Sequence, residues 1–136
     1  MNRILTYGTF DVFHYGHSKI IERARQMGDE LYVGVSTDLF NCEKGKFAFD
    51  GFPARSQKVF ATNLVTQVFA ESSMSQKRSD IARLKINILV MGDDWKGAFD
   101  YLHDVCEVRY LMRTPNISST MIRNEMKKSQ MGDCLR

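Results

Sequence analysis

Residues 3–17 read RILTYGTFDVFHYGH, and this stretch holds the first predicted strand and the first polar motif. The apolar residues 3–7 predict a buried strand, and the spacing of apolar residues from Gly16 to Met27 predicts an amphipathic helix. Two histidines, His14 and His17, lie three positions apart where that helix begins. Because a strand followed at once by a helix is the first half of a βαβ unit, the stretch predicts an α/β fold.

The same alternation continues along the rest of the chain. It predicts strands at residues 30–36, 66–71, 87–92 and 107–112, and helices at 54–64, 75–85, 97–105 and 118–128. The strands are apolar runs, as expected of a parallel sheet that helices cover on both faces. We therefore predict a single-domain doubly wound parallel sheet over residues 1–128, followed by a C-terminal tail at residues 129–136.

The composition argues against several classes of function. Of the 136 residues, 43% are hydrophobic and 26% charged, which is typical of one globular domain. A net charge of +3 without a long Lys/Arg run does not favour a nucleic-acid partner. The chain has no apolar run near ~20 residues and its start is too weakly apolar for a signal peptide, so we expect a cytoplasmic protein without a membrane partner. The three cysteines fit no zinc pattern and favour free thiols.

Polar motifs follow four of the predicted strands. In doubly wound sheets, ligands bind at the carboxyl ends of the strands. The motifs occupy residues 8–17, 36–38, 92–95 and 113–120. We therefore expect these four segments to converge on one edge of the sheet.

The two histidines allow three interpretations. Residues three apart at a helix start can face one ligand, and Gly16 between them lets the backbone approach it closely. A helix N-terminus favours anions, and imidazoles donate hydrogen bonds to phosphate oxygens, charged if protonated. A metal pair is weaker, because helical zinc pairs are normally spaced four apart with a Glu between. Simple packing of the histidines remains the third interpretation.

Taken together, the motifs resemble those of a known family. Gly8-Thr9-Phe10-Asp11 followed by His14-Tyr15-Gly16-His17 is similar to the signature of the HxGH nucleotidyltransferase superfamily. The segments STD at 36–38, MGDDW at 91–95 and RTPNISST at 113–120 resemble the glycerol-3-phosphate cytidylyltransferase family. The resemblance runs almost collinearly from residue 1 to about residue 128. It implies a Rossmann-like nucleotidyltransferase fold and a homodimer.

The resemblance also implies a reaction. The family makes CDP-glycerol and pyrophosphate from CTP and sn-glycerol 3-phosphate, for polymers such as teichoic acid or capsule. The acceptor phosphate attacks the α-phosphorus in line, so the protein has to position the substrates and neutralise charge. Mg²⁺, or another divalent cation, is expected to bind mainly through the CTP phosphates. The alternatives are another small phosphorylated acceptor such as phosphoethanolamine, an ATP-dependent adenylyltransferase, or a non-catalytic nucleotide sensor.

Site residues are carried over from the family motif by motif. For catalysis the resemblance implies His14, His17, Lys44, Lys46 and Arg113. For CTP binding it implies Thr9, Phe10, His14, Tyr15, Gly16, His17, Lys46, Gly92, Asp94, Trp95, Arg113, Thr114, Ile117, Ser118, Ser119 and Thr120. For the acceptor it implies Asp11, Asp38, Lys44, Arg55 and Lys77. Asp11 is also the one protein residue that the resemblance suggests as a partner of a metal-bound water.

Without the resemblance, some of these residues look ordinary. Lys77 reads as an exposed helical lysine, and Arg55 as a solvated surface arginine. The chain also departs from the family pattern: Asn63 replaces an arginine, Met74 an aromatic residue and Asn116 a glycine. The first two departures lie on the acceptor side of the expected site and not at the triphosphate clamp.

Overall fold

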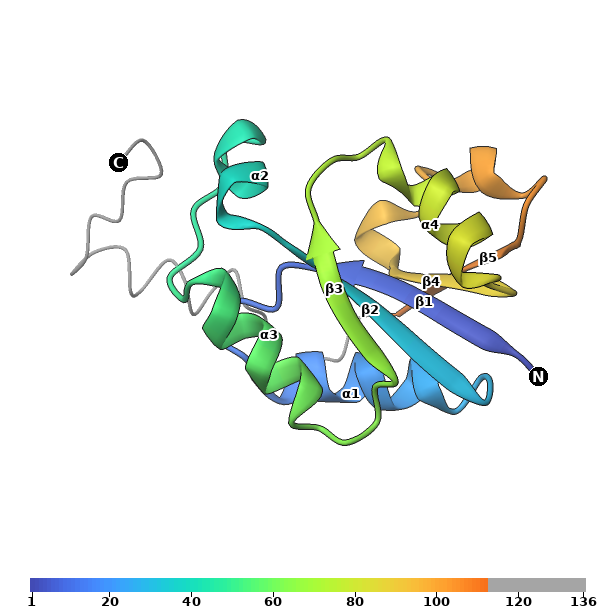
Figure 1. Cartoon of the computed structure of the whole chain (residues 1–136), viewed down its shortest axis with the longest axis horizontal. Coiled ribbons are helices and arrows are strands. Elements are labelled where there is room, and N and C mark those ends of the chain that lie inside the picture. The colour runs from blue at the N-terminus through green and yellow to red at the C-terminus, as the bar shows by residue number, and fades with distance from the viewer. Residues whose placement is uncertain (113–136) are drawn as a thin grey trace.

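Five parallel strands form one sheet at the centre of the molecule (Figure 1). The computed structural model describes residues 1–112, so the predicted helix at 118–128, the tail and the boundary between them lie outside the described residues. The strands are β1 (Arg3–Gly8), β2 (Glu30–Ser36), β3 (Gln67–Glu71), β4 (Ile88–Gly92) and β5 (Glu107–Leu111). Their order is β3-β2-β1-β4-β5, which confirms the predicted doubly wound sheet.

Helices connect the strands, and most of them lie where the sequence pattern predicts. They are α1 (Tyr15–Arg25), α2 (Asp38–Glu43), α3 (Phe52–Phe60) and α4 (Gln76–Leu84), with the short 3₁₀ helices η1 (Asp93–Trp95) and η2 (Asp100–Leu102). The helix α2 was not predicted, because its six residues are too few to show a clear apolar period. Its N-cap is Thr37, whose hydroxyl accepts a hydrogen bond from the amide of Phe40.

The prediction of one helix over residues 97–105 is wrong. The segment contains η2 instead, and Gly97 before it has a φ of 85°. A residue with positive φ cannot be part of a right-handed helix, so Gly97 cannot belong to the predicted helix. Asn63 has the same kind of conformation, with a φ of 63° just beyond the end of α3. Asparagine tolerates this conformation better than arginine does, which gives a local reason for the departure from the family pattern.

Two cores cover the two faces of the sheet. On one face, Ile4, Val33 and Val90 pack in a core that also contains residues of α1 and α3. On the other face, Leu5 and Leu89 pack in a core with residues of α4, η2 and the loop before it. Figure 1 shows α1 and α3 on one side of the sheet and α4 on the other. Helices on both faces explain why the strands are continuous apolar runs.

The strand order places the functional edge. From β1 the chain winds outward to β2 and β3, then crosses to β4 and β5 on the other side of β1. The reversal makes a crevice beyond the carboxyl ends of β1 and β4, where doubly wound proteins bind ligands. Among residues 1–112, no helix is long and apolar enough to cross a membrane.

Candidate active site

The loop that follows β1 has a strained backbone. Phe10 and Val12 have φ values of 55° and 47°, in a region that bulky and β-branched residues rarely adopt. Such conformations cost about 1–3 kcal/mol each and persist where the surrounding structure enforces them. The Phe10 ring is buried and packs edge-on against His17, with ring centroids 5.5 Å apart. The Phe10 side chain therefore packs against His17. A contact between Phe10 and a nucleotide would have to be made by the Phe10 backbone.

The two histidines are held by the backbone where α1 begins. His14 is the N-cap of α1, and its Nδ1 accepts a hydrogen bond from the Gly16 amide at 2.9 Å. In return, Nδ1 of His17 accepts a hydrogen bond from the His14 amide at 3.3 Å. The two rings stack with centroids 4.0 Å apart. Because Nδ1 of His14 acts as an acceptor, the neutral His14 ring carries its hydrogen on Nε2, which is the atom that can donate to a ligand.

His14 is suited to donate a hydrogen bond while uncharged. Burial lowers its pKa below the usual 6.5, so the ring is neutral at pH 7. Its Nε2 is buried and has no hydrogen-bond partner within residues 1–112. A buried N–H without a partner is unfavourable unless a ligand satisfies it. These observations favour the predicted phosphate clamp over simple packing.

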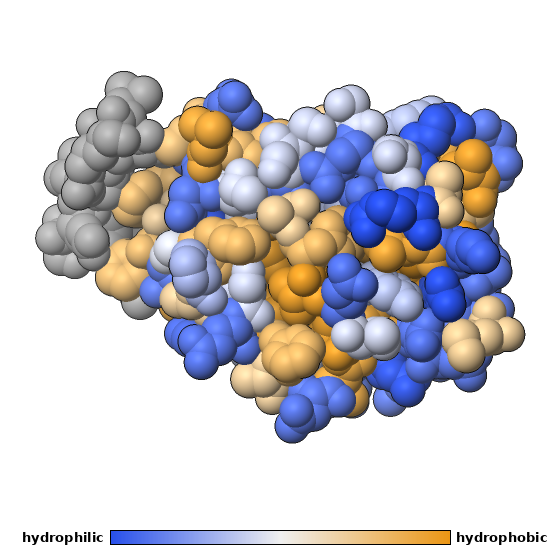
Figure 2. Space-filling model, in the orientation of Figure 1, coloured by the Kyte–Doolittle hydropathy of each residue, from blue (hydrophilic) through white to orange (hydrophobic). Residues whose placement is uncertain are grey.

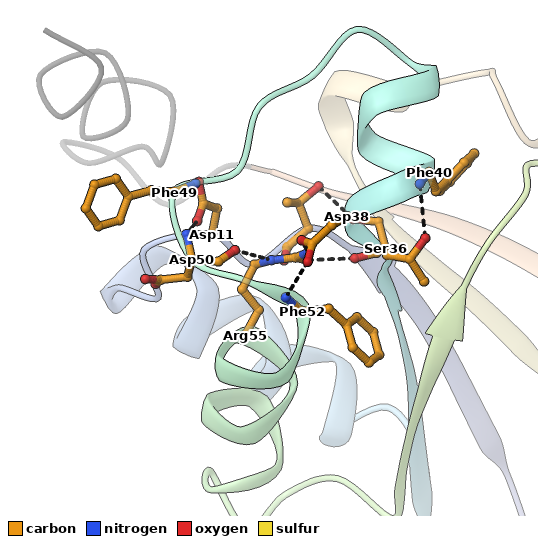
Figure 3. A network of polar contacts seen from close by, with 10 residues as sticks. Asp11, Ser36, Asp38, Phe40, Phe49, Asp50, Phe52 and Arg55 are labelled. Atoms are coloured by element: carbon orange, nitrogen blue, oxygen red, sulfur yellow. Dashed lines mark hydrogen bonds and ion pairs between the residues drawn. The ribbon is translucent and has the colours of Figure 1, made fainter. Parts of the chain in front are cut away.

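The Arg55 side chain is hydrogen-bonded to the segments at the carboxyl ends of β1 and β2 (Figure 3). Its side chain is 0% exposed. Nε donates to the Asp50 carbonyl at 2.9 Å, and one terminal nitrogen donates to the carbonyls of Thr9 and Ser36 at 2.9 and 2.7 Å. The other terminal nitrogen pairs with Asp38 at 2.7 Å. We call this arrangement the Arg55 network; it joins β1, β2, α2 and α3.

Two aspartates predicted at the acceptor extend this network. Asp11 is buried, and its two carboxylate oxygens accept hydrogen bonds from the amides of Phe49 and Asp50 at 2.7 and 2.9 Å (Figure 3). Asp38 accepts a hydrogen bond at 3.1 Å from the amide of Phe52, the first residue of α3. Both aspartates therefore hold the segment between α2 and α3.

The structure shows which protein groups three of the predicted acceptor residues contact. Asp11, Asp38 and Arg55 all bind other parts of the protein, and none of them lines the pocket at the strand ends. The alternative interpretation of Arg55 as a solvated surface residue is also wrong, since it is fully buried. All three are positioning residues for the loop that carries Lys44 and Lys46.

A pocket opens at the carboxyl ends of the strands. It encloses about 400 Å³, including the solvent at its mouth. It is lined by Tyr7, Gly8, Thr9, Lys44, Lys46, Glu71, Met74, Lys77, Met91, Trp95 and Phe99. These residues come from the ends of three strands, the loop after α2, the region of α4, and η1 with the turn after it. Of the segments predicted to converge on one edge, 8–17 and 92–95 both line the pocket, and Ser36 of the segment 36–38 donates a hydrogen bond to Thr9.

Lys44 and Lys46 supply positive charge to this pocket. Gly45 between them has a φ of 73°, which favours glycine and makes the turn that separates the two side chains. The Lys44 ammonium lies 4.0 Å from the centre of the Phe40 ring, and burial lowers the pKa of Lys44 below 10.5. The Lys46 ammonium lies 5.4 Å from the centre of the Trp95 ring. Lysine ammonium groups placed in this way suit phosphate groups.

Glu71 was not predicted as a site residue, although its side chain contacts that of Lys77, which was predicted. It ends β3, and its Oε2 pairs with Nζ of Lys77 at 2.5 Å. Lys77 is 1% exposed and Glu71 is 4% exposed, so reading Lys77 as a surface lysine is wrong. The available signal was that Glu71 ends a strand at the same edge as the other motifs.

The remaining predicted residues are partly visible. Gly92 ends β4, and Asp94 and Trp95 form part of η1. Tyr15 begins α1 with most of its side chain exposed. Arg113, Thr114, Ile117, Ser118, Ser119 and Thr120 lie outside the described residues.

Comparisons with known proteins agree with these motifs. A family model described as cytidylyltransferase-like matches residues 5–125. The chain is 48% identical to the glycerol-3-phosphate cytidylyltransferase of Bacillus spizizenii, over 93% of this chain and 98% of the relative. It is 44% identical to the protein of the same name from Staphylococcus aureus, over 93% of this chain and 96% of the relative.

A solved structure also shares the fold. The lipopolysaccharide core biosynthesis protein of Thermoplasma volcanium matches with a TM-score of 0.70 and 19% identity, over 84% of this chain and 98% of that one. At this identity the match supports the architecture alone. The sequence matches, in contrast, confirm the resemblance seen in the motifs.

Proposed function

Because this chain belongs to the cytidylyltransferase-like family, we propose that it transfers the cytidylyl group of CTP to sn-glycerol 3-phosphate. The match spans almost the whole length of two relatives, and both are named glycerol-3-phosphate cytidylyltransferase, which supports this acceptor. The observation that carries the proposal is the pair of backbone-held histidines that opens α1, at the same sheet edge as a lysine-lined pocket. Such a site neutralises and orients phosphates and contributes no nucleophile of its own.

The reaction follows from the charges that the site supplies. An oxygen of the acceptor phosphate attacks the α-phosphorus of CTP, a new P–O bond forms, and the bond to the β-phosphate oxygen breaks to release pyrophosphate. Nε2–H of His14 donates to a phosphate oxygen of CTP, where negative charge builds in the transition state. Lys44 holds the acceptor phosphate and Lys46 holds CTP, so that the reacting atoms meet in line.

A divalent cation is proposed to enter with CTP. Residues 1–112 contain no group of three His, Cys, Asp or Glu side chains arranged to hold a metal ion. Asp11 already accepts two backbone hydrogen bonds, so it fits a structural role better than that of a metal ligand. The lysines instead suit a triphosphate that brings its own Mg²⁺, and this ion would neutralise phosphate charge.

Pyrophosphate release tests the function. With Mg²⁺, CTP and sn-glycerol 3-phosphate, we expect turnover together with formation of CDP-glycerol. ATP in place of CTP is the control for the base, and phosphoethanolamine is the control for the acceptor. Turnover with ATP and not with CTP would contradict the donor. Turnover with phosphoethanolamine alone would contradict the acceptor, and tight CTP binding without turnover would leave a nucleotide sensor.

We also propose that the protein is a cytoplasmic homodimer, as its family resemblance implies. The edge strand β3 and helix α3 border a shallow groove that includes Phe52, Phe60 and Val68. Figure 2 shows apolar residues gathered on this face, and more than half of the Phe60 surface is exposed. Sedimentation of the wild type and of Phe60→Glu tests the proposal. A dimer that the variant weakens is expected, and a wild-type monomer would contradict it.

A further inference from the structure

The pocket contains one carboxylate among three lysines. Lys44, Lys46 and Lys77 suit anionic substrates, whereas Glu71 would repel a phosphate placed beside it. Glu71 is nevertheless almost fully buried at the pocket wall. An ionised carboxylate is retained in such a place only if it is paired and hydrogen-bonded, so its partners indicate its role.

Lys77 neutralises Glu71. Its Nζ lies 2.5 Å from Oε2 of Glu71, which makes a buried ion pair. Around the rest of the ammonium lie apolar groups: the ring centres of Tyr7 and Phe99 at 4.4 and 5.2 Å, and the sulfur of Met74 at 3.7 Å. The strongest partner of Lys77 is thus Glu71. Lys77 therefore orients the Glu71 carboxylate, and it does so while lining the same pocket.

The second oxygen of Glu71 remains available. Of its two carboxylate oxygens, only Oε2 has a hydrogen-bond partner among the described residues. The charge of Glu71 also raises the pKa of Lys44, which opposes the effect of burial on that lysine. Glu71 and Lys44 therefore act on the same space, one with a hydrogen-bond acceptor and the other with a positive charge.

We propose that Glu71, oriented by Lys77, accepts hydrogen bonds from hydroxyl groups of the acceptor while Lys44 holds its phosphate. This inference rests on the proposed function and adds a residue that selects the acceptor. A carboxylate oxygen accepts hydrogen bonds readily, and a hydroxyl bound to it is one of the stronger neutral-to-charged contacts. The pocket then fits a polyol phosphate, with its phosphate at one end and its hydroxyls at the other.

The same charges act against an amino alcohol phosphate. The Glu71–Lys77 pair carries no net charge, and Lys44 and Lys46 line the same pocket. A substrate ammonium would meet these lysines in a poorly solvated space, where like charges repel strongly. A neutral hydroxyl meets no such penalty. The site therefore prefers a hydroxyl to an ammonium at the same position of the substrate.

Acceptor analogues test the inference in the wild-type enzyme first. We expect kcat/KM to fall roughly ten- to hundredfold from sn-glycerol 3-phosphate to propyl phosphate, which lacks both hydroxyls. We also expect 2-hydroxyethyl phosphate to react faster than phosphoethanolamine, from which it differs only in carrying OH in place of NH₃⁺. Equal rates with glycerol 3-phosphate and propyl phosphate, or a preference for phosphoethanolamine, would overturn the inference.

The variant Glu71→Gln then assigns the selectivity to this residue. It is expected to reduce the preference for glycerol 3-phosphate over propyl phosphate by most of that factor, with little change in the KM for CTP. An unchanged preference, or an equal loss with every acceptor, would mean that Glu71 is only structural. The double variant Glu71→Gln/Lys77→Met leaves no buried charge unpaired and gives the same comparison if the single variant does not fold. Glu107→Gln, an exposed carboxylate on β5, is the matched control.

The analogue series separates this inference from the proposed function. If wild-type protein releases no pyrophosphate with CTP and any acceptor, the proposed function fails. If it turns over and discriminates between analogues but Glu71→Gln discriminates equally, only the role of Glu71 fails.

Discussion

Arg55 and Lys77 are both cations with almost no exposed surface, and both resemble acceptor-binding residues in the sequence. They differ in what surrounds their charge. Arg55 donates to three backbone carbonyls and to Asp38, all beneath the site. Lys77 has one carboxylate partner and borders a pocket. Arg55, whose donor groups bind other parts of the protein, therefore stabilises the fold. Lys77, which borders the pocket, helps to shape a binding site.

The sharpest test of this difference is Arg55→Met. The variant leaves the carbonyls of Thr9, Ser36 and Asp50 without this donor, so we expect the free energy of unfolding to fall by about 3–5 kcal/mol. Urea denaturation measures it. Arg55→Lys, which keeps the charge but not the fork of donors, should lie between the variant and the wild type. A variant as stable as the wild type would show that the Arg55 network is not structural.

His14 combines both roles in one ring, and two substitutions separate them. Asparagine can replace Nδ1 as the cap of α1 but cannot place a donor where Nε2 lies. We expect His14→Asn to lower kcat about 10²–10³-fold, with stability within about 1 kcal/mol of the wild type. His14→Ala should lose the same activity and, in addition, about 1 kcal/mol of stability. Wild-type turnover in either variant would contradict the phosphate clamp.

Lys44 belongs to the pocket and should behave unlike Arg55. We expect Lys44→Gln to lower kcat/KM for the acceptor about ten- to hundredfold, because a charged contact to phosphate is lost. Stability should change by less than about 1 kcal/mol, since no buried partner loses its hydrogen bond. Steady-state kinetics and urea denaturation of one preparation measure both. A large loss of stability with unchanged kinetics would place Lys44 in the structural group.

The smallest effect concerns pH. Because the pKa of His14 is lowered in the folded protein, the unfolded chain binds more protons just below pH 6.5. The contribution of His14 to stability is therefore complete above pH 6.5, declines as the pH falls, and levels off below the folded-state pKa. Thermal unfolding of the wild type and His14→Asn from pH 8 to pH 5 should show a shallower decline in the variant. Parallel curves would contradict the shift.

The motifs predicted the fold and the placement of the two histidines better than the burial of Arg55 and Lys77. His14 and His17 are three residues apart and use local backbone partners, so a short sequence pattern specifies their geometry. The Glu71–Lys77 pair depends on the turn between β3 and α4 and on rings from other elements, and no local pattern reports it. The burial of Arg55 and Lys77 could not be predicted from the sequence either, because both have the spacing of surface cations. The helix α2 was too short for its apolar period to be read.

The position of β1 in the middle of the sheet has a consequence for synthesis on the ribosome. Ile4 pairs with Leu31 on one side and with Ile88 on the other. The first three strands can therefore assemble soon after they emerge, but one side of β1 stays open until β4 has been made. Such distant pairings form slowly because a long loop must close first. The pocket, which needs Trp95 and Phe99, completes only in this later stage, so a nascent chain cannot bind both substrates before its second half has folded.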